Sequence, residues 1–168
     1  MDRDTILHYL QELNQELARL GVIGEVCLYG GAVMCLVYAA RPSTKDVDAI
    51  FQPAQQIREA IARVAAHHNL RDDWLNDAVK GFVVQHPQRI FLDASHLKVY
   101  VPEPDYLLAM KTLAARVDTT DRQDIQFLIE ELALTTPEQV FAILEKYYPQ
   151  QRVRPATQFF VEELFGQS

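Results

Sequence analysis

Two adjacent glycines, Gly30 and Gly31, separate a short β-prone run from a stretch of small apolar residues, and this succession constrains the fold more than any other feature. The run before them, 25–29, has the length and composition of a strand. The stretch after them, 32–40, is too long and too rich in alanine for a strand, which favours a buried helix. Residues 46–51 then alternate between two faces, as a strand does. The sequence therefore predicts strand, glycine turn, helix and strand, the opening of a mixed α/β fold.

Apolar spacing, capping residues and prolines predict the other elements. The first helix follows Asp4 and Thr5, either of which can cap it, and it ends at Gly21. Thr120 and Gln123 have the spacing of a capping box at the start of a later helix. The remaining expected elements are helices over 53–69 and 104–116, helices that begin at Pro137 and after Pro155, and a hairpin of strands 89–93 and 97–101.

The order of these elements predicts how the chain is organised. The expected strands are confined to the first hundred residues, and the remainder is helical. We therefore expect an α/β core with a mixed sheet over 1–101 and a C-terminal helical region over 102–168, packed on the core as a single compact unit. With 168 residues, 49% of them hydrophobic and 23% charged, the chain has the size and composition of one globular domain.

Charge and cysteine content narrow the classes of partner and compartment. Sixteen Lys and Arg against twenty-three Asp and Glu give a net charge of −7, which disfavours a broad cationic face for nucleic acid and leaves room for a small basic groove. Cys27 and Cys35 lie in apolar surroundings, so we expect buried thiols rather than a disulfide. No apolar run approaches the roughly 18 residues of a membrane span. We expect a cytoplasmic protein without a membrane partner.

Two carboxylates on one strand form the candidate metal site. Asp46 and Asp48 would point to the same side with Cα atoms about 6.6 Å apart, so both can reach one or two divalent ions. Mg²⁺, or Mn²⁺ in its place, usually brings substrate phosphates with it. Gly30 and Gly31 would offer phosphates backbone N–H groups and a helix N-terminus, with no side chain in the way. The alternatives are a solvated strand face and an ordinary glycine turn.

The order of these motifs carries a family resemblance. Strand, Gly-Gly, helix, the loop Ser43-Thr44-Lys45 and Asp46-Val-Asp48 together resemble the opening of the nucleotidyltransferase superfamily with the polymerase β-like core. That resemblance implies that the glycine turn and the two aspartates hold a nucleoside triphosphate and its metals. Thr44 and Lys45 would either contact phosphate or shape the loop.

Later segments narrow the resemblance to one branch. Residues 106–116 and 120–125 look like the later motifs of the AbiEii-type branch, the toxin-like nucleotidyltransferases of bacterial toxin–antitoxin and phage-defence systems. They are most similar to a small uncharacterised family within that branch, to which 74–80 is also similar. The resemblance implies a nucleoside triphosphate substrate, an RNA, protein or small-molecule acceptor, and an antitoxin partner.

The same resemblance implies roles for charged residues on the later helices. Lys111 would neutralise phosphate charge, Arg116 would bind phosphate, and either Asp121 or Asp124 would be the supporting acid. The alternative is that Lys111 and Arg116 form the solvated edge of an amphipathic helix. Asp121 would then lie in a first helical turn, where the helix dipole favours a negative charge regardless of function.

The pattern departs from the family at the third carboxylate. Many catalytically competent members place a third acid on a later strand, and here the choices are Asp93 and Asp77. Asp93 can equally be a hairpin-turn residue. The ordered motifs lead us to expect a Mg²⁺-dependent nucleotidyltransferase. Because a clear third acid is missing, the alternative is a catalytically inactive nucleotide-binding or protein-interaction module.

Two further features have plainer interpretations. His67 and His68 are adjacent, so on a helix they diverge by about 100° and do not chelate as a pair. We expect surface histidines there, and no zinc-like Cys/His spacing occurs in the sequence. Trp74 can stack on a base, but core packing is the favoured interpretation.

Overall fold

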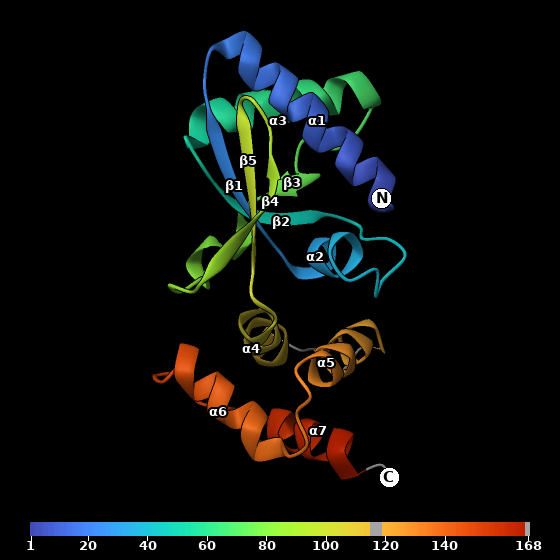
Figure 1. Cartoon of the computed structure of the whole chain (residues 1–168), viewed down its shortest axis with the longest axis vertical. Coiled ribbons are helices and arrows are strands. Elements are labelled where there is room, and N and C mark those ends of the chain that lie inside the picture. The colour runs from blue at the N-terminus through green and yellow to red at the C-terminus, as the bar shows by residue number, and fades with distance from the viewer. Residues whose placement is uncertain (115–118, 167–168) are drawn as a thin grey trace. The chain divides into compact units, whose positions relative to one another are not determined.

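The computed structural model describes residues 1–114 and 119–166, and its chain forms two compact units. The first unit combines Met1–Val83 with Gln88–Pro102, and the second combines Val84–Pro87 with Glu103–Ser168. The first unit is α/β with a mixed sheet, and the second is helical (Figure 1). The predicted fold class, a nucleotidyltransferase-like α/β core with a C-terminal helical region, is therefore confirmed.

A five-stranded sheet forms the centre of the first unit. Its strands are β1 (Gly24–Tyr29), β2 (Val47–Gln52), β3 (Leu75–Asn76), β4 (Gln88–Asp93) and β5 (Leu97–Pro102), in the order β3-β2-β1-β5-β4. The outer pair β4 and β5 and the central pair β1 and β2 are antiparallel, whereas β5 runs parallel to β1 and β3 runs parallel to β2. The short strand β3 lies in the segment that the sequence predicts as a linker. Two residues are too few to show the alternation from which a strand is predicted.

Two helices, α1 (Arg3–Leu20) and α3 (Ala54–His68), lie together on one face of this sheet (Figure 1). A Cβ at Gly24 would lie 2.9 Å from a Leu17 methyl and 3.0 Å from an Ile57 methyl, so β1 packs closely under both helices. The core there is fully buried and consists of Ile6, Leu10, Leu13, Leu17, Val26, Leu28, Val47, Ala49, Ile57, Val64 and Val99. Trp74 is also buried and donates its indole N–H to the Ile61 carbonyl at 3.1 Å, which confirms core packing.

Several predicted helix ends are displaced. Asp2 caps α1, not Asp4 or Thr5, because the Asp2 carboxylate accepts the Thr5 backbone N–H at 2.8 Å. The predicted end at Gly21 is confirmed, since this residue has a φ of 68°. The helix after the glycine turn, α2 (Gly30–Leu36), starts and ends earlier than predicted. Ala39, which the prediction placed in the helix, has a left-handed conformation with φ 51° and cannot continue it.

The second unit is built from α4 (Pro104–Ala114), α5 (Thr119–Glu131), α6 (Pro137–Tyr147) and α7 (Pro155–Gly166). The Tyr106 hydroxyl of α4 forms hydrogen bonds with residues of two other segments. It lies 2.8 Å from the Tyr148 hydroxyl and accepts the Val84 backbone N–H at 3.0 Å, so the segment 84–87 belongs to this unit. A capping box occurs at Thr136 and Gln139. The one predicted at Thr120 depends on a side chain that lies outside the described part of the structure.

Both cysteines are buried free thiols, as predicted. Burial raises the pKa of Cys27 to about 11 and also raises the pKa of Cys35. Within residues 1–114 and 119–166, no helix is both long and apolar enough to cross a membrane.

Candidate functional site

The sheet fixes the position of Asp48. This residue pairs in register with Tyr29, the last residue of β1, so it lies beside the turn at Gly30. A Cβ at Gly30 would come within 2.9 Å of the Asp48 Oδ2 atom, and Gly30 has a φ of 65°. Only glycine meets both conditions without strain. The structure therefore brings together two of the residues predicted from the sequence.

Asp46 lies just before β2, which begins one residue later than predicted. Its side chain is half-buried, as is that of Asp48, and its carbonyl accepts the Thr44 hydroxyl at 3.1 Å. Between the two aspartates, Val47 is fully buried under the helices. Strand alternation therefore turns Asp48 away from the helical layer.

The loop 41–46 closes over the second glycine. A Cβ at Gly31 would overlap the Arg41 guanidinium and come within 2.8 Å of the Thr44 hydroxyl. Thr44 is buried, and its backbone N–H and carbonyl bond the Met1 carbonyl at 2.9 Å and the Met1 amino group at 2.8 Å. Thr44 therefore shapes the loop, and Lys45 is exposed on it.

Arg41 was missed by sequence reasoning. The signal for it was its position, since it is the first charged residue after the glycine turn and opens the loop that leads to Asp46. A guanidinium beside a glycine turn and a carboxylate strand is suited to phosphate, because its planar N–H groups bind two oxygens at once.

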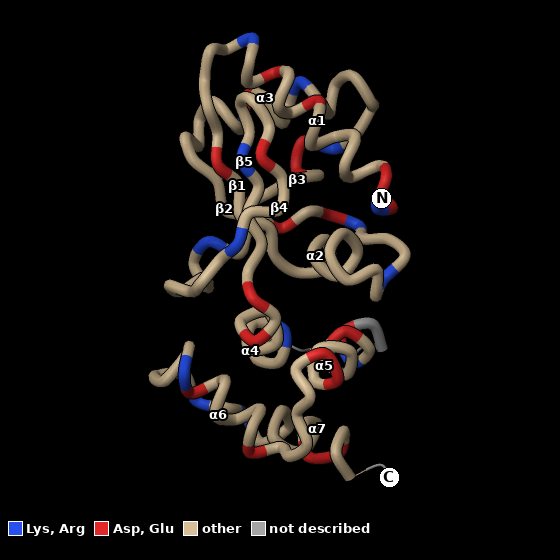
Figure 2. The backbone as a smooth tube through the Cα atoms, viewed as in Figure 1, with Lys and Arg blue, Asp and Glu red and all other residues tan. Residues whose placement is uncertain are grey.

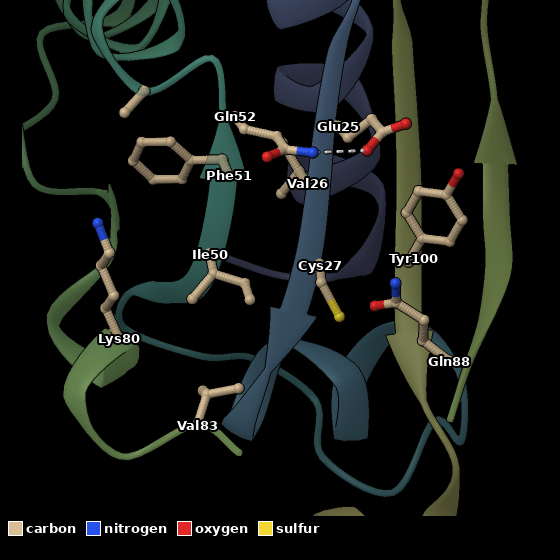
Figure 3. Close-up of a pocket in the computed structure, with 11 residues that line it drawn as sticks. Glu25, Val26, Cys27, Ile50, Phe51, Gln52, Lys80, Val83, Gln88 and Tyr100 are labelled. Atoms are coloured by element: carbon tan, nitrogen blue, oxygen red, sulfur yellow. Dashed lines mark hydrogen bonds between the residues drawn. The ribbon is translucent and has the colours of Figure 1, made fainter. Parts of the chain in front are cut away.

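A pocket lies on the sheet face that α1 and α3 leave uncovered. Glu25 and Cys27 of β1 pair with Gln52 and Ile50 of β2, and these side chains point into it with Tyr100 of β5 (Figure 3). Its volume is about 480 Å³. Asp48 shares this face, because Asp48, Ile50 and Gln52 alternate along β2.

The pocket combines charged and neutral groups. Lys80, on the short 3-10 helix η1 (Ala78–Gly81), lines it and is exposed. Gln52 donates to the Glu25 carboxylate at 3.1 Å (Figure 3). Because burial raises the pKa of Cys27 to about 11, its thiol is protonated at neutral pH and is a poor nucleophile. The pocket is therefore suited to binding rather than to thiolate chemistry.

A comparison with known families decides what kind of protein carries this arrangement. Residues 6–148 match the model of a family described as nucleotidyltransferase of unknown function (DUF6036). The chain belongs to this nucleotidyltransferase family. The match confirms the predicted superfamily. No curated protein and no solved structure matches the chain.

The two candidates for a third acid of the nucleotidyltransferase both form ion pairs with other residues. Asp93 pairs in register with Lys98, at the end of the sheet opposite Asp48, and its carboxylate lies 2.7 Å from the Lys98 ammonium. Asp77 forms an ion pair with Arg58 of α3 at 2.7 Å. The structure therefore does not bring either acid to the pair.

The residue beside Asp48 on β3 is an asparagine and not a third acid. Asn76 pairs in register with Asp48, as Tyr29 does on the other side. Its amide bonds locally, since its oxygen accepts the Ala78 N–H and its nitrogen donates to the Asp73 carbonyl, both at 3.1 Å. The strand positions that flank Asp48 are therefore both non-acidic.

In the second unit, Lys111 is buried in an ion-pair cluster. Its side chain is 8% exposed, and its ammonium lies 2.8 Å from Asp124 and 3.7 Å from Asp121. Asp124 is 2% exposed, whereas Asp121 is 29% exposed. The solvated-edge alternative is therefore wrong for Lys111, because the helix face that carries it is covered. Arg116 lies outside the described residues.

Lys and Arg positions are distributed over both units and interspersed with Asp and Glu positions (Figure 2). The site itself combines both signs, with Arg41 and Lys45 close in sequence to Asp46 and Asp48. Local charge of this kind suits a nucleotide with its cation better than a long nucleic-acid backbone, which needs many cations in a row.

Proposed function

We propose that this protein transfers a nucleoside monophosphate from a nucleoside triphosphate to a hydroxyl group in a Mg²⁺-dependent reaction. The observation that carries the proposal is the Asp48 carboxylate held against the Gly30 turn, on the same sheet face as the pocket. Membership in the nucleotidyltransferase family supports the reaction class. The acceptor hydroxyl belongs to an RNA, a protein or a small molecule.

The residues at the turn fit a magnesium–triphosphate complex. Carboxylate oxygens are the protein ligands that Mg²⁺ prefers, and Mn²⁺ accepts the same donors. The Asp48 carboxylate lies directly against Gly30, so any larger side chain at this position would displace it. We therefore assign Asp46 and Asp48 to the metal. When bound, Mg²⁺ stabilises the charge that develops on the phosphates.

The other residues of the site bind and position the substrate. Arg41 and Lys45 would neutralise phosphate oxygens, and the backbone at Gly30 would meet a phosphate beside Asp48. The expectation that no side chain stands in the way is wrong for Gly31, because Arg41 and Thr44 lie against it. The pocket would hold the nucleoside or the acceptor. Lys111 remains our candidate for offsetting phosphate charge, with Asp124 positioning its ammonium.

The reaction makes one bond and breaks another. The acceptor oxygen bonds to the α-phosphorus, the bond to the pyrophosphate oxygen breaks, and pyrophosphate leaves with the bond electrons. Positioning and electrostatic stabilisation supply most of such catalysis. The acceptor proton passes to a water molecule, because both carboxylates at the turn are assigned to the metal.

Labelled nucleotide tests the proposal directly. The protein is incubated with each labelled nucleoside triphosphate, Mg²⁺ and a cell extract, and label on RNA, protein and small molecules is counted. We expect transfer by the wild type and by Asp93→Asn, which changes an acid remote from the site. Asp46→Asn/Asp48→Asn should abolish transfer. Equal labelling by wild type and double variant would end the enzyme proposal.

A toxin role would place the protein in the AbiEii-like branch, with an antitoxin as its partner. The support is the similarity of 106–116 and 120–125 to that branch. Expression without neighbouring genes should arrest growth, and Asp46→Asn/Asp48→Asn should relieve the arrest. Arrest that persists in the double variant contradicts a toxin role that depends on transfer.

The residues that flank Asp48 favour a second candidate function, nucleotide binding without turnover. Tyr29 and Asn76 occupy these strand positions, and Asp77 is engaged with Arg58. Without a third carboxylate, deprotonation of the acceptor is weakened while binding is retained. Nucleotide binding in calorimetry, together with no labelled product, would support this second function.

A further inference from the structure

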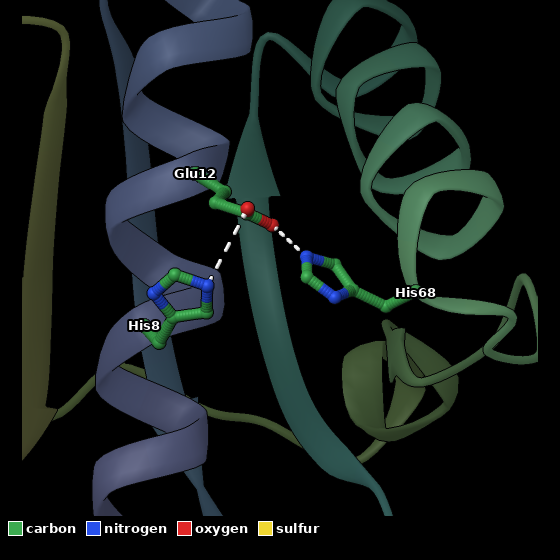
Figure 4. Close-up of side chains that lie close together, drawn as sticks. All are labelled: His8, Glu12 and His68. Atoms are coloured by element: carbon green, nitrogen blue, oxygen red, sulfur yellow. Dashed lines mark hydrogen bonds and ion pairs between the residues drawn. The ribbon is translucent and has the colours of Figure 1, made fainter.

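Two histidines and a glutamate converge on the helical layer of the first unit (Figure 4). His8 and Glu12 lie four residues apart on α1, and His68 is the last residue of α3. One potential ligand atom from each of the three lies within 4.8 Å of the other two. Of the two histidines predicted to lie on the surface, His67 is exposed, whereas His68 is half-buried and contacts Glu12.

Both imidazoles turn the same nitrogen toward the same carboxylate. His8 Nε2 lies 3.4 Å from one Glu12 oxygen, and His68 Nε2 contacts the other (Figure 4). Helical spacing of four residues places His8 and Glu12 on one face of α1. Three ligand atoms from two helices therefore face one another without any change of backbone.

The surroundings hold the rings in this arrangement. The Tyr9 ring lies 4.9 Å from the His68 ring and 5.5 Å from the buried Trp74 ring, centroid to centroid. The His8 and His68 rings meet edge to face at 5.6 Å. His8 is 57% exposed, which leaves an entry path from solvent. His68 is therefore packed against aromatic rings, while His8 leaves the cluster accessible from solvent.

The donor set selects the kind of ion. Two imidazole nitrogens and one carboxylate oxygen are characteristic ligands of Zn²⁺ and similar transition-metal ions, with a fourth position left to water. Mg²⁺ prefers oxygen ligands alone. Ligand atoms of a tetrahedral zinc site lie roughly 3.3 Å apart, given bond lengths of about 2.0–2.1 Å. The 3.4 Å separation of His8 Nε2 and its Glu12 oxygen agrees with this spacing. His68 Nε2 is in direct contact with the other Glu12 oxygen, so its ring would turn outward to bind the ion.

We propose that His8, Glu12 and His68 form a transition-metal site, with Zn²⁺ as its best fit, that links α1 to α3. The site is distinct from the proposed magnesium site, because α1 and α3 cover the sheet face opposite the pocket. Its role is structural. Joining two helices that share the core stabilises the first unit whenever the metal is bound.

Calorimetry with Zn²⁺, in a buffer that contains excess Mg²⁺, tests the site. We expect one Zn²⁺ per chain, with the affinity reduced about ten-fold or more in His8→Ala and in His68→Ala. His67→Ala is the matched control, because His67 is exposed and points about 100° away on the same helix. No binding, displacement by Mg²⁺, or unchanged affinity in both cluster variants would overturn the proposal.

Thermal unfolding tests the structural role and separates the two metal sites. Zn²⁺ should raise the melting temperature of the wild type, of His67→Ala and of Asp46→Asn/Asp48→Asn, but not of His8→Ala. His8 is on the surface, so its replacement leaves the fold intact. A melting temperature that Zn²⁺ leaves unchanged in the wild type would refute the helix link, whatever the outcome of the labelling assay.

Discussion

Two pairs of aspartates, Asp46 with Asp48 and Asp121 with Asp124, lie in opposite kinds of environment. Both members of the first pair are half-buried: Asp46 lies just before β2, and Asp48 lies on β2, against the glycine turn and on the sheet face that carries the pocket. Both members of the second pair lie close to the Lys111 ammonium, and the Asp124 side chain is almost fully buried. An acidic pair that surrounds a buried lysine serves the fold first, whereas the half-buried pair at the glycine turn is the one that we assign to a metal ion.

The largest expected effect is on the buried pair. Asp124→Ala should lower the free energy of unfolding by about 3–5 kcal/mol, because it leaves the Lys111 ammonium buried without its nearest carboxylate. Asp48→Asn should cost less than about 1 kcal/mol, since its site is half-exposed. Denaturant unfolding measures both. Equal losses in the two variants would erase the contrast between the pairs.

A neutral replacement of the buried pair separates stability from activity. Lys111→Met/Asp124→Leu should recover most of the stability that Asp124→Ala loses, because neither charge remains buried. If Lys111 also offsets phosphate charge, this folded double variant should lose label transfer. Full transfer by the stable double variant would assign Lys111 to the fold alone.

The glycine turn should be the next most sensitive position. Gly30→Ala should cost about 2 kcal/mol, because alanine is strained at a φ of 65° and its methyl group would press on the Asp48 carboxylate. Gly81→Ala is the control, since a Cβ at Gly81 would meet nothing within 4 Å. Urea unfolding compares the two. A Gly30→Ala variant as stable as Gly81→Ala would place Asp48 farther from the turn than described.

The Cys27 thiol, which lines the pocket, gives an effect that depends on pH. Cys27 has its pKa raised from 9.0 to about 11 by burial, so between these values the folded state keeps a proton that the unfolded state loses. Its contribution to stability should therefore fall as the pH rises from 9 to 11, by at most about 1.4 kcal/mol per pH unit. Unfolding at several pH values should show a shallower decline for Cys27→Ala. Identical slopes would mean that Cys27 is as accessible to water as in the unfolded chain.

The smallest effect is expected at the outer aspartate of the buried cluster. Asp121 is 29% exposed and lies 3.7 Å from Lys111, so Asp121→Asn should cost no more than about 1 kcal/mol. Denaturant unfolding of Asp121→Asn and Asp124→Ala in the same series compares how much each acid contributes to the free energy of unfolding. A larger loss at Asp121 than at Asp124 would reverse their assigned order.

The sequence predicted those parts of the fold that local patterns encode. Gly30, Gly31 and the alternation around Asp48 specify a turn and a strand face within a few residues, and the structure places them accordingly. Helix ends were less predictable. Asp2 and Asp4 are both good capping residues, and the choice between them depends on which carboxylate meets a free N–H.

What the sequence could not predict depends on contacts between distant segments. Arg41 reaches the glycine turn only because the loop 41–46 folds back over it, pinned at Thr44 by Met1. Asp93 was one of two choices for a third acid, with a hairpin-turn residue as the alternative, and the pairing of β4 with β5 places it at the other end of the sheet. His68 meets Glu12 across 56 residues of sequence, a separation at which spacing within one helix gives no signal.

Calorimetric titration with each nucleoside triphosphate, with and without Mg²⁺, tests the central claim most directly. The wild type and the remote control Asp93→Asn should bind at least one triphosphate in the presence of Mg²⁺. Binding should weaken about ten-fold or more in Asp48→Asn and when Mg²⁺ is withheld. A triphosphate bound as tightly by Asp48→Asn as by the wild type, or no triphosphate bound at all, would contradict a metal–nucleotide site at the glycine turn.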